Sequence, residues 1–476
     1  MKILFAVDEA YPLFKIGGLG DVGGSLPIAL TKLQIDVRIA LPKHPEIDTK
    51  DLDLHLLDSF DITYKRQPLP VKVWSTYLPG SLVPVYLFQE ARYISEKTDA
   101  GDNHADKFTV FSLAVATWLN LPERSWLPQL IHLQDWHTAM IPVILKHHFH
   151  DTRFKHVITI HNLAFQGNTN TPILRNLDLP QAECRILTWD GLDNHINILL
   201  EGILHADATT TVSPTYAHEI LTSEYGEHLE DVLNTKKHHI IGILNGLDYN
   251  TFNPETDPYI YHQYNDTNAL EVKNINKKAL LKDLKLNLEI PELIGFVGRV
   301  DPAQKGIALI IEALEQKGLT NDHTQFIFLG TGDPLLEQRL HQAAANDPKC
   351  CIVAKFDEPL ARKVYAAADL IVIPSKYEPC GLVQMIAMRY GAIPVARKTG
   401  GLADTIHHDG NGFLFDHFTT ADLVQAIAKA QQTMNTPDKR AHMIKEAMNT
   451  NFTWIEPAKH YQELFEQILL DEDFNP

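Results

Sequence analysis

Cysteine is scarce in this chain, and long apolar runs are missing. The 476 residues contain four cysteines, none of them paired as Cys-x-x-Cys, which disfavours a zinc knuckle, a dithiol redox motif and a disulfide framework. No stretch approaches the roughly 18 uninterrupted apolar residues that a membrane-spanning helix needs. The opening run 1–7 meets Asp8 and Glu9 at once, unlike the longer apolar region of a signal peptide. These features favour a cytoplasmic enzyme.

Positive charge is also in short supply. Lys and Arg number 42 against 60 Asp and Glu, which gives a formal net charge of −18. Such a chain repels nucleic acid and anionic membranes unless it carries a strong local basic patch, and no run of Lys and Arg is long enough to be one. We therefore expect neither as a partner. An anionic small substrate would have to be held by isolated cations.

Short apolar runs alternate with helical patterns along most of the chain. Because these runs are apolar throughout, they predict strands buried on both faces of a parallel sheet. Alternation with helices predicts doubly wound α/β domains. The runs are 3–7, 37–41, 83–88, 130–133, 157–160 and 209–212 in the first half, and 293–297, 326–329, 352–356, 370–373 and 393–396 in the second.

A turn cluster at 245–248 and a polar stretch at 254–276 divide this series of strands. The length suits two large domains or three small ones. We predict a first domain over 1–244 and a second over 245–453, followed by an amphipathic helix from Trp454 to Leu469. Ligands bind at the carboxyl ends of the strands in such sheets, so two domains that face each other would enclose a cleft.

A glycine cluster, Lys15-Ile16-Gly17-Gly18-Leu19-Gly20-Asp21-Val22-Gly23-Gly24, precedes an expected helix over 21–32. It fits G-x-G-x-x-G literally. A nicotinamide site is nevertheless disfavoured, because the cluster does not follow its strand directly and no acidic residue ends the second strand. Bare N–H groups, the helix dipole and Lys15 could together bind an anion. A tight turn with an incidental lysine is the alternative.

Two clusters follow expected strands of the second domain. Arg299 and Lys305 could neutralise a leaving diphosphate, although a solvated loop explains them as well. Glu378 lies between a strand and a helix that begins near Leu382. Its carboxylate could reach a bound sugar while the amides of 380–383 hold oxygen atoms; a capping glutamate is the alternative.

Histidines are common, and two positions stand out. His161 directly follows an expected strand, as does the segment Asp135-Trp136-His137, so either could contact a substrate; a structural histidine is the alternative. In the cluster His147-His148-Phe149-His150 the spacing does not project three rings together, so we expect no metal site there.

Taken together, these residues resemble the family of bacterial glycogen synthases and plant starch synthases. The similarity spans nearly the whole chain and rests on eight motifs in register: 15–22, 135–137, 161–167, 211–214, 242–248, 330–333, 378–382 and 399–405. It implies a GT-B architecture of two Rossmann-like domains, with the C-terminal helix (about 454–476) crossing back to the first. It also implies ADP-glucose as donor, an α-1,4-glucan as acceptor, no metal or cofactor, retention at the anomeric carbon, and a cytoplasmic or, in a plant lineage, stromal location.

The resemblance further implies roles for single residues. Around the reacting bond it places Glu378 beside the transferred glucose, His161 at the glucose 6-hydroxyl or behind the reacting face, and Arg299 and Lys305 on the diphosphate. The implied substrate contacts are Lys15, Gly17 and Gly18 at donor phosphate and acceptor glucose, Asp21 and Asp135 near the donor sugar, Asn162 beside His161, Asn245 with Cys380, Gly381, Leu382 and Val383 around the sugar phosphate, Phe356 under adenine, and Tyr93 near donor or acceptor.

Some positions depart from the family pattern. Five residues separate Arg299 from Lys305 where four are usual, Gln134 replaces a His or Asn, and Val383 replaces a threonine. Two other functions are consistent with the motifs: another retaining glycosyltransferase of this architecture, and a glucan-binding homologue without activity. The second is disfavoured because Glu378, Lys15 and Arg299 are all present.

Overall fold

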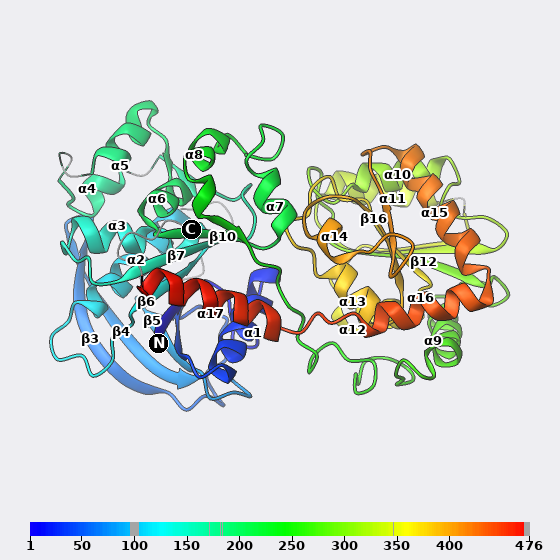
Figure 1. The fold of residues 1–476 in the computed structure, drawn as a ribbon, viewed down its shortest axis with the longest axis horizontal. Helices are drawn as coiled ribbons and strands as arrows, with labels where there is room; N and C mark the ends of the chain where they lie inside the picture. The colour runs from blue at the N-terminus through cyan, green and yellow to red at the C-terminus, as the bar shows by residue number, and fades with distance from the viewer. Residues whose placement is uncertain (96–103, 171, 181, 183, 346, 471–476) are drawn as a thin grey trace. The chain divides into compact units, whose positions relative to one another are not determined.

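The computed structural model describes residues 1–95, 104–170, 172–180, 182, 184–345 and 347–470 (Figure 1). The chain forms two compact units. The first contains Met1–Val212, Ala217–Gly246 and Trp454–Pro476, and the second contains Ser213–Tyr216 and Leu247–Thr453. In the described part of the chain no helix is both long and apolar enough to cross a membrane.

The first unit is built on a nine-stranded sheet with the order β11-β10-β7-β6-β1-β2-β5-β4-β3. Its central strand, β1, pairs in parallel with β2 on one side and β6 on the other. Seven of the strands are parallel: β1 (Lys2–Ala6), β2 (Asp36–Pro42), β5 (Pro84–Gln89), β6 (Leu130–Gln134), β7 (Lys155–Ile160), β10 (Ala208–Thr211) and β11 (Ile240–Gly242).

A long antiparallel hairpin, which the apolar runs did not predict, extends this sheet at one edge. It consists of β3 (His55–Tyr64) and β4 (Gln67–Tyr77). Pro68 and Pro70 lie in β4, and they are tolerated because β4 pairs with β5 only from Lys72 onward; a proline cannot donate a ladder hydrogen bond. The hairpin is half-exposed, so its apolar residues alternate with polar ones instead of forming a continuous run.

Helices cover both faces of this sheet. On one face, α1 and α17 share a core with alternate strand residues such as Phe5 and Leu87. On the other, Phe88 contacts two aromatic side chains of α2. The helices of the unit are α1 (Gly18–Lys32), α2 (His104–Leu119), α3 (Met140–His147), α4 (Ile173–Asn176), α5 (Arg185–Asp190), α6 (Ile198–His205), α8 (Glu230–Thr235) and α17 (Ile455–Leu470). The helix α7 (Pro214–Glu219) spans the boundary between the units. The strands β8 (Asn168–Thr169) and β9 (Ile196–Asn197) form a separate two-stranded sheet.

The second unit contains a six-stranded parallel sheet with the order β14-β13-β12-β15-β16-β17. Its strands are β12 (Glu292–Val297), β13 (Thr324–Leu329), β14 (Cys350–Val353), β15 (Leu370–Ile373), β16 (Ile393–Arg397) and β17 (Phe413–Phe415). Its helices are α9 (Ala269–Asp283), α10 (Ile307–Glu315), α11 (Pro334–Ala344), α12 (Glu358–Ala367), α13 (Val383–Arg389), α14 (Gly400–Thr405), α15 (Thr420–Met434) and α16 (Pro437–Asn449).

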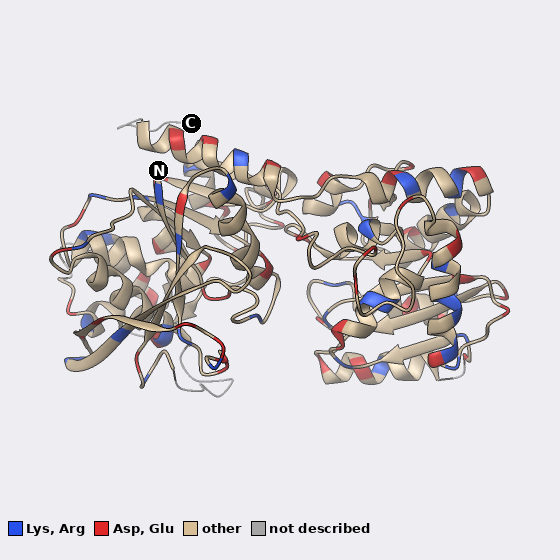
Figure 2. Ribbon diagram, turned by 90° about the horizontal axis from the view of Figure 1, so that it is seen from below, with Lys and Arg blue, Asp and Glu red and all other residues tan. Residues whose placement is uncertain are grey.

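The predicted fold class is confirmed: each unit is a doubly wound α/β sheet, and the C-terminal helix belongs to the first unit. One strand ends earlier than predicted. The run 352–356 was expected to be a strand, but β14 ends at Val353 because Asp357 already caps α12. Charges of both signs are interspersed along both units (Figure 2), in keeping with the absence of a long basic run.

Candidate active site

The glycine loop of the first unit is held by a buried carboxylate. Glu9 follows β1, and its Oε2 accepts hydrogen bonds from the backbone N–H groups of Ile16 (2.6 Å) and Gly17 (2.8 Å). Burial raises the pKa of Glu9. The Gly17 amide, expected to meet substrate, therefore already has a partner here. Sequence reasoning missed this role of Glu9; its position just after the first strand was the available signal.

The glycines of this loop serve two different purposes. At Gly23 an added β-carbon would lie 2.1 Å from the carbonyl oxygen of Glu9, so this glycine is required for the close approach of α1 to the loop. At Gly17 an added β-carbon would meet nothing within 4 Å. Packing therefore does not require Gly17, which leaves open space over the loop where a ligand could approach the backbone.

Two charged residues predicted to contact substrate contact each other. Lys15 Nζ lies 2.7 Å from Asp21 Oδ1, in the first turn of α1. Lys15 was expected at donor phosphate and acceptor glucose, and Asp21 near the donor sugar. The pair is partly exposed, with side-chain exposures of 31% and 20%, so an incoming anion could compete with Asp21 for the ammonium.

Asp135 adopts a strained backbone conformation at the carboxyl end of β6. Its φ is 53° and its ψ is −171°, a region that almost only glycine adopts and that costs about 1–3 kcal/mol. Asp135 Oδ1 accepts a hydrogen bond of 2.7 Å from the backbone N–H of His161. Burial raises the pKa of Asp135 to about 7. Strain together with a raised carboxyl pKa is typical of functional sites.

His161 follows β7 and is held by Gln134. The distance from His161 Nε2 to Gln134 Oε1 is 2.8 Å. Since an amide oxygen only accepts, Nε2 carries the proton and Nδ1 remains as the acceptor of the ring. Burial lowers the pKa of His161 to about 3, so the ring is neutral near pH 7. The departure noted at Gln134 thus places a side-chain amide against the ring of a predicted site residue.

The remaining predicted residues of the first unit differ in the contacts that their side chains already make. Asn245 is buried, and its side-chain oxygen has no hydrogen-bond partner among the described residues. Asn162 Oδ1 accepts from the backbone N–H of Ala164 at 3.1 Å. The ring of Tyr93 packs edge-on against Tyr64, with 5.5 Å between ring centroids.

In the second unit an ion pair joins the loops that follow β12 and β15. Lys305 Nζ lies 2.9 Å and 2.7 Å from the two carboxylate oxygens of Glu378. Glu378 is 6% exposed and also accepts a hydrogen bond of 2.9 Å from the hydroxyl of Ser375. Both charged residues were predicted at the reacting bond. Their contact with each other and the role of Ser375 were not.

Close backbone packing fixes these two loops against each other. Gly306 has a φ of 68°, and a β-carbon there would lie 2.0 Å from the carbonyl oxygen of Pro374. The backbone N–H of Lys376 donates to the carbonyl of Gln304 at 2.7 Å. Gln304 in turn accepts from the guanidinium of Arg299 at 3.0 Å. The longer spacing from Arg299 to Lys305 therefore forms an ordered loop.

The segment after Glu378 leads into α13. The backbone N–H groups of Leu382 and Val383 lie at its beginning, where helical amides have no acceptor within the helix. The side chain of Gln384 donates to the carbonyls of Cys380 (3.0 Å) and Gly381 (2.8 Å). These bonds hold the backbone of 380–383, the segment predicted to line the sugar-phosphate site.

Phe356 lies beyond the end of β14 and is 82% exposed. An aromatic ring left in solvent is available as a stacking surface. For metals, the described residues include no group of three or more His, Cys, Asp or Glu side chains that could hold an ion.

Comparison with known proteins places this chain in a family. Residues 2–235 match the model of the starch synthase catalytic domain, and residues 291–432 match that of glycosyl transferases group 1. Glycogen synthase from Thermotoga maritima is 38% identical over 491 residues, covering 98% of this chain and 99% of the relative. The chain belongs to the glycogen and starch synthase family. It is therefore a glycosyltransferase, as the motifs predicted.

Other relatives agree with this membership. Glycogen synthase from Kosmotoga olearia is 39% identical over 484 residues, covering 98% of each chain. The catalytic domain of starch synthase IV from Arabidopsis thaliana, bound to ADP and acarbose, superimposes with a TM-score of 0.88 at 30% identity over 99% of both chains. Sucrose-phosphate synthase from Thermosynechococcus elongatus shares the fold, with a TM-score of 0.61, 19% identity and coverage of 98% and 99%.

Proposed function

We propose that this synthase transfers glucose from ADP-glucose to the non-reducing end of an α-1,4-glucan with retention of configuration. The observation that carries the proposal is the buried contact between Lys305 and Glu378 at the ends of β12 and β15. It holds an ammonium and a carboxylate side by side, and glycosyl transfer develops charge of both signs. Binding of ADP and acarbose by the Arabidopsis relative supports a nucleotide-sugar donor and a glucan acceptor.

The negative charge develops on the leaving group. As the bond between the anomeric carbon and the diphosphate oxygen breaks, the electron pair goes to the diphosphate. Arg299 and Lys305 stabilise that charge, and fixed cations are most effective where charge grows in the transition state. Lys305 shifts part of its contact from Glu378 to the phosphate, so it serves both groups. Phe356 stacks on the adenine, and the amides of 380–383 with Asn245 line the sugar-phosphate region.

The positive charge develops on the glucose ring. Glu378 stabilises the oxocarbenium-like ring electrostatically, while the acceptor hydroxyl attacks from the face that the diphosphate leaves. The hydroxyl proton passes to the departing phosphate oxygen, so no protein base is required. A double displacement would need two carboxylates about 5–5.5 Å apart. Eight residues after Glu378, on α13, stands the apolar Ile386 and not a second carboxylate.

The first unit supplies recognition of the sugars and of the donor phosphate. His161, with Nδ1 as its acceptor, binds the glucose 6-hydroxyl, and Asp135 and Asn162 lie beside it. Lys15, Asp21 and the Gly17–Gly18 loop contact donor phosphate and acceptor glucose, and Tyr93 contacts the acceptor side. In this proposal residues 1–244 with the C-terminal helix form the acceptor-side domain, and 245–453 form the nucleotide-sugar domain.

Nucleotide release during extension of glycogen tests this function. We expect ADP release from ADP-glucose to exceed UDP release from UDP-glucose, with α-1,4 linkages in the product by NMR. Equal turnover with both donors would contradict the donor assignment. A glucan-binding homologue without activity would release neither nucleotide.

A further inference from the structure

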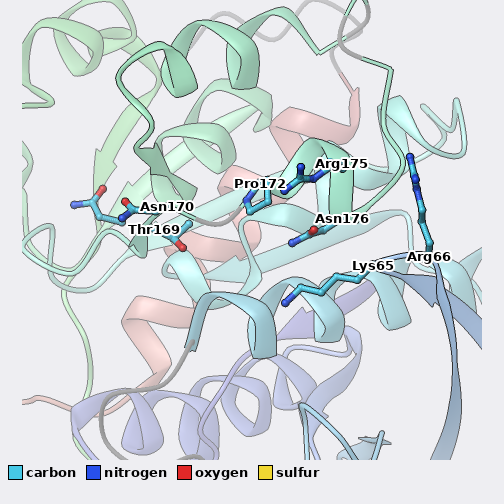
Figure 3. A pocket seen from close by; sticks show the side chains of 8 residues that line it. Lys65, Arg66, Thr169, Asn170, Pro172, Arg175 and Asn176 are labelled. Atoms are coloured by element: carbon cyan, nitrogen blue, oxygen red, sulfur yellow. The ribbon is translucent and has the colours of Figure 1, made fainter.

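A polar cavity of about 880 Å³ lies in the first unit, and none of the residues predicted for the active site lines it. It is lined by eight residues: Lys65, Arg66, Asn168, Thr169, Asn170, Pro172, Arg175 and Asn176 (Figure 3). Lys65 and Arg66 come from the turn between β3 and β4, and the others come from the segment that leads into and forms α4. None of these eight residues is acidic or aromatic, so the cavity suits neither a cation nor an apolar ligand.

The turn between β3 and β4 holds Lys65 and Arg66 in an unfavourable backbone conformation. Lys65 and Arg66 have φ values of 52° and 59°, whereas turns with two positive φ angles normally use Asn or Gly. The turn is anchored from both sides. The backbone N–H of Lys65 donates to the carbonyl of Asn176 at 2.9 Å, and Lys65 Nζ and Tyr64 Oη each lie 2.5 Å from an oxygen of Asp106.

The charges around the cavity do not cancel. Three cations line it and one of them, Lys65, is paired with Asp106, which leaves a net charge of +2. Among the described residues neither Arg66 nor Arg175 has an ion-pair partner. The chain as a whole has a net charge of −18. The two guanidinium groups that line this cavity therefore give it a local charge opposite to that of the chain. Guanidinium groups bind phosphate through paired charge-assisted hydrogen bonds.

We propose that this cavity binds a small phosphate ester with a hydroxylated body. Arg66 and Arg175 hold the phosphate, while the side-chain amides of Asn168, Asn170 and Asn176 donate to and accept from hydroxyl groups. Both halves of this chemistry are present: an excess of positive charge for the anion, and uncharged groups of both hydrogen-bonding types for the rest of the molecule.

The position of the cavity predicts the step of the reaction that the ligand would alter. The Lys65 ammonium lies 5.6 Å from the ring centroid of Tyr93, and Asn168 directly follows the loop that begins at His161. An anion that draws Lys65 from Asp106 changes the contact with Tyr93. On the acceptor role proposed for Tyr93, the ligand should change the KM for glucan and leave the KM for the donor unchanged.

Calorimetry tests the site independently of activity. The full chain is titrated with ribose 5-phosphate, inorganic phosphate and ribose while saturating ADP occupies the proposed donor site. We expect ribose 5-phosphate to bind most tightly, inorganic phosphate more weakly and ribose not measurably. Absence of binding by both phosphates would overturn the proposal, as would equal binding of ribose. Displacement of ribose 5-phosphate by maltoheptaose would overturn it too, because the cavity would then be a glucan subsite.

Two variants assign the binding to the cavity. Arg66→Gln and Arg175→Gln remove charge but keep polar side chains, and each should weaken ribose 5-phosphate about tenfold or more, since each removes hydrogen bonds to a charged group. The control Arg339→Gln, at an exposed position on α11, should bind as the unmodified chain does. Unchanged affinity in a correctly folded double variant, checked by its melting temperature, would refute the site. The KM for glucan, measured with and without ribose 5-phosphate, separately tests whether the cavity is coupled to Tyr93.

Discussion

In the first unit burial keeps the imidazole of His161 neutral and the carboxyl of Asp135 close to half-protonated at pH 7, whereas in the second unit Lys305 and Glu378 form an ion pair. Buried groups that carry little charge and are fixed by hydrogen bonds suit the recognition of hydroxyls, which are themselves uncharged. Paired charges suit the place where a bond breaks. On the proposed roles, His161 and Asp135 serve recognition while Lys305 and Glu378 stabilise charge, and each side of that comparison can be tested by changing one side chain.

The charged half should show the largest effect. Glu378→Gln keeps the shape of the side chain and removes its charge, so kcat should fall about 10²–10³-fold with little change in donor affinity. The measurement is ADP release at saturating donor and glycogen. The control Glu463→Gln, on the exposed side of α17, should be neutral.

Two results would contradict this role of Glu378. One is a covalent glucosyl adduct on Glu378, which would require a double displacement. The other is a kcat that Glu378→Gln leaves unchanged.

Removing the cation of the pair should affect stability as well as rate. Lys305→Gln leaves Glu378 buried without its ion-pair partner, which should cost about 3 kcal/mol in the free energy of unfolding and lower kcat/KM. The double variant Lys305→Gln/Glu378→Gln should regain much of the stability but not the activity. Urea denaturation of the four proteins measures the coupling; additive losses in stability would show that the pair is not linked in solution.

The buried carboxyl of Asp135 should make the stability of the protein depend on pH. Because burial raises the pKa of Asp135 to about 7, the folded state binds a proton that the unfolded state has released above pH 3.8. The contribution of Asp135 to stability is therefore fully present below pH 3.8, decreases as the pH rises towards 7 and is lost above it. Asp135→Asn should raise the free energy of unfolding at pH 8 by on the order of 1–3 kcal/mol and by less at pH 5.

Denaturation of both proteins at pH 5 and pH 8 measures this difference. An equal effect of Asp135→Asn at the two pH values would mean that the carboxyl is not desolvated as described. His161 does not obscure this comparison, because its pKa is lowered from 6.5 to about 3 in both proteins, so both lose the same stability as the pH falls below 6.5.

The smallest expected effect concerns the nucleotide. Phe356→Ala should weaken ADP-glucose by about 1 kcal/mol, the lower end of the range for base stacking, whereas Phe356→Tyr should bind as the unmodified chain does. Equilibrium binding of ADP to the three proteins provides the test. Unchanged affinity of Phe356→Ala would contradict the proposed stacking of Phe356 on adenine, but not the proposed roles of Lys305 and Glu378.

The sequence predicted the buried strands well and the exposed ones poorly. Runs such as 370–373 are apolar throughout and became β15 without change. The hairpin of β3 and β4 was missed because its residues alternate between solvent and core and two prolines interrupt it. The strand predicted over 352–356 lay too far along the chain: β14 spans Cys350–Val353, and Asp357 already caps α12.

Within the candidate site, the sequence identified residues but not their contacts. Lys305 and Glu378 were each singled out beside a strand end, yet they are 73 residues apart, and nothing local indicates that they meet. Glu9 was passed over because its partners are backbone amides of 16 and 17, and a backbone hydrogen bond leaves no trace in side-chain identity. The assigned roles of all these residues remain predictions.

The C-terminal helix α17 has a consequence for synthesis. Its side chains Tyr461, Phe465 and Ile468 belong to the same core as β1, and a β-carbon at Gly246 would lie 2.7 Å from Trp454. Domains generally fold as units, beginning with the N-terminal one, while the ribosome is still at work. Here the strands made first cannot complete their core until residues 247–453 have also been made. The second unit is nearly continuous in sequence and can finish earlier, so the first part to leave the ribosome is the last to become fully folded and depends longest on protection of its apolar surface.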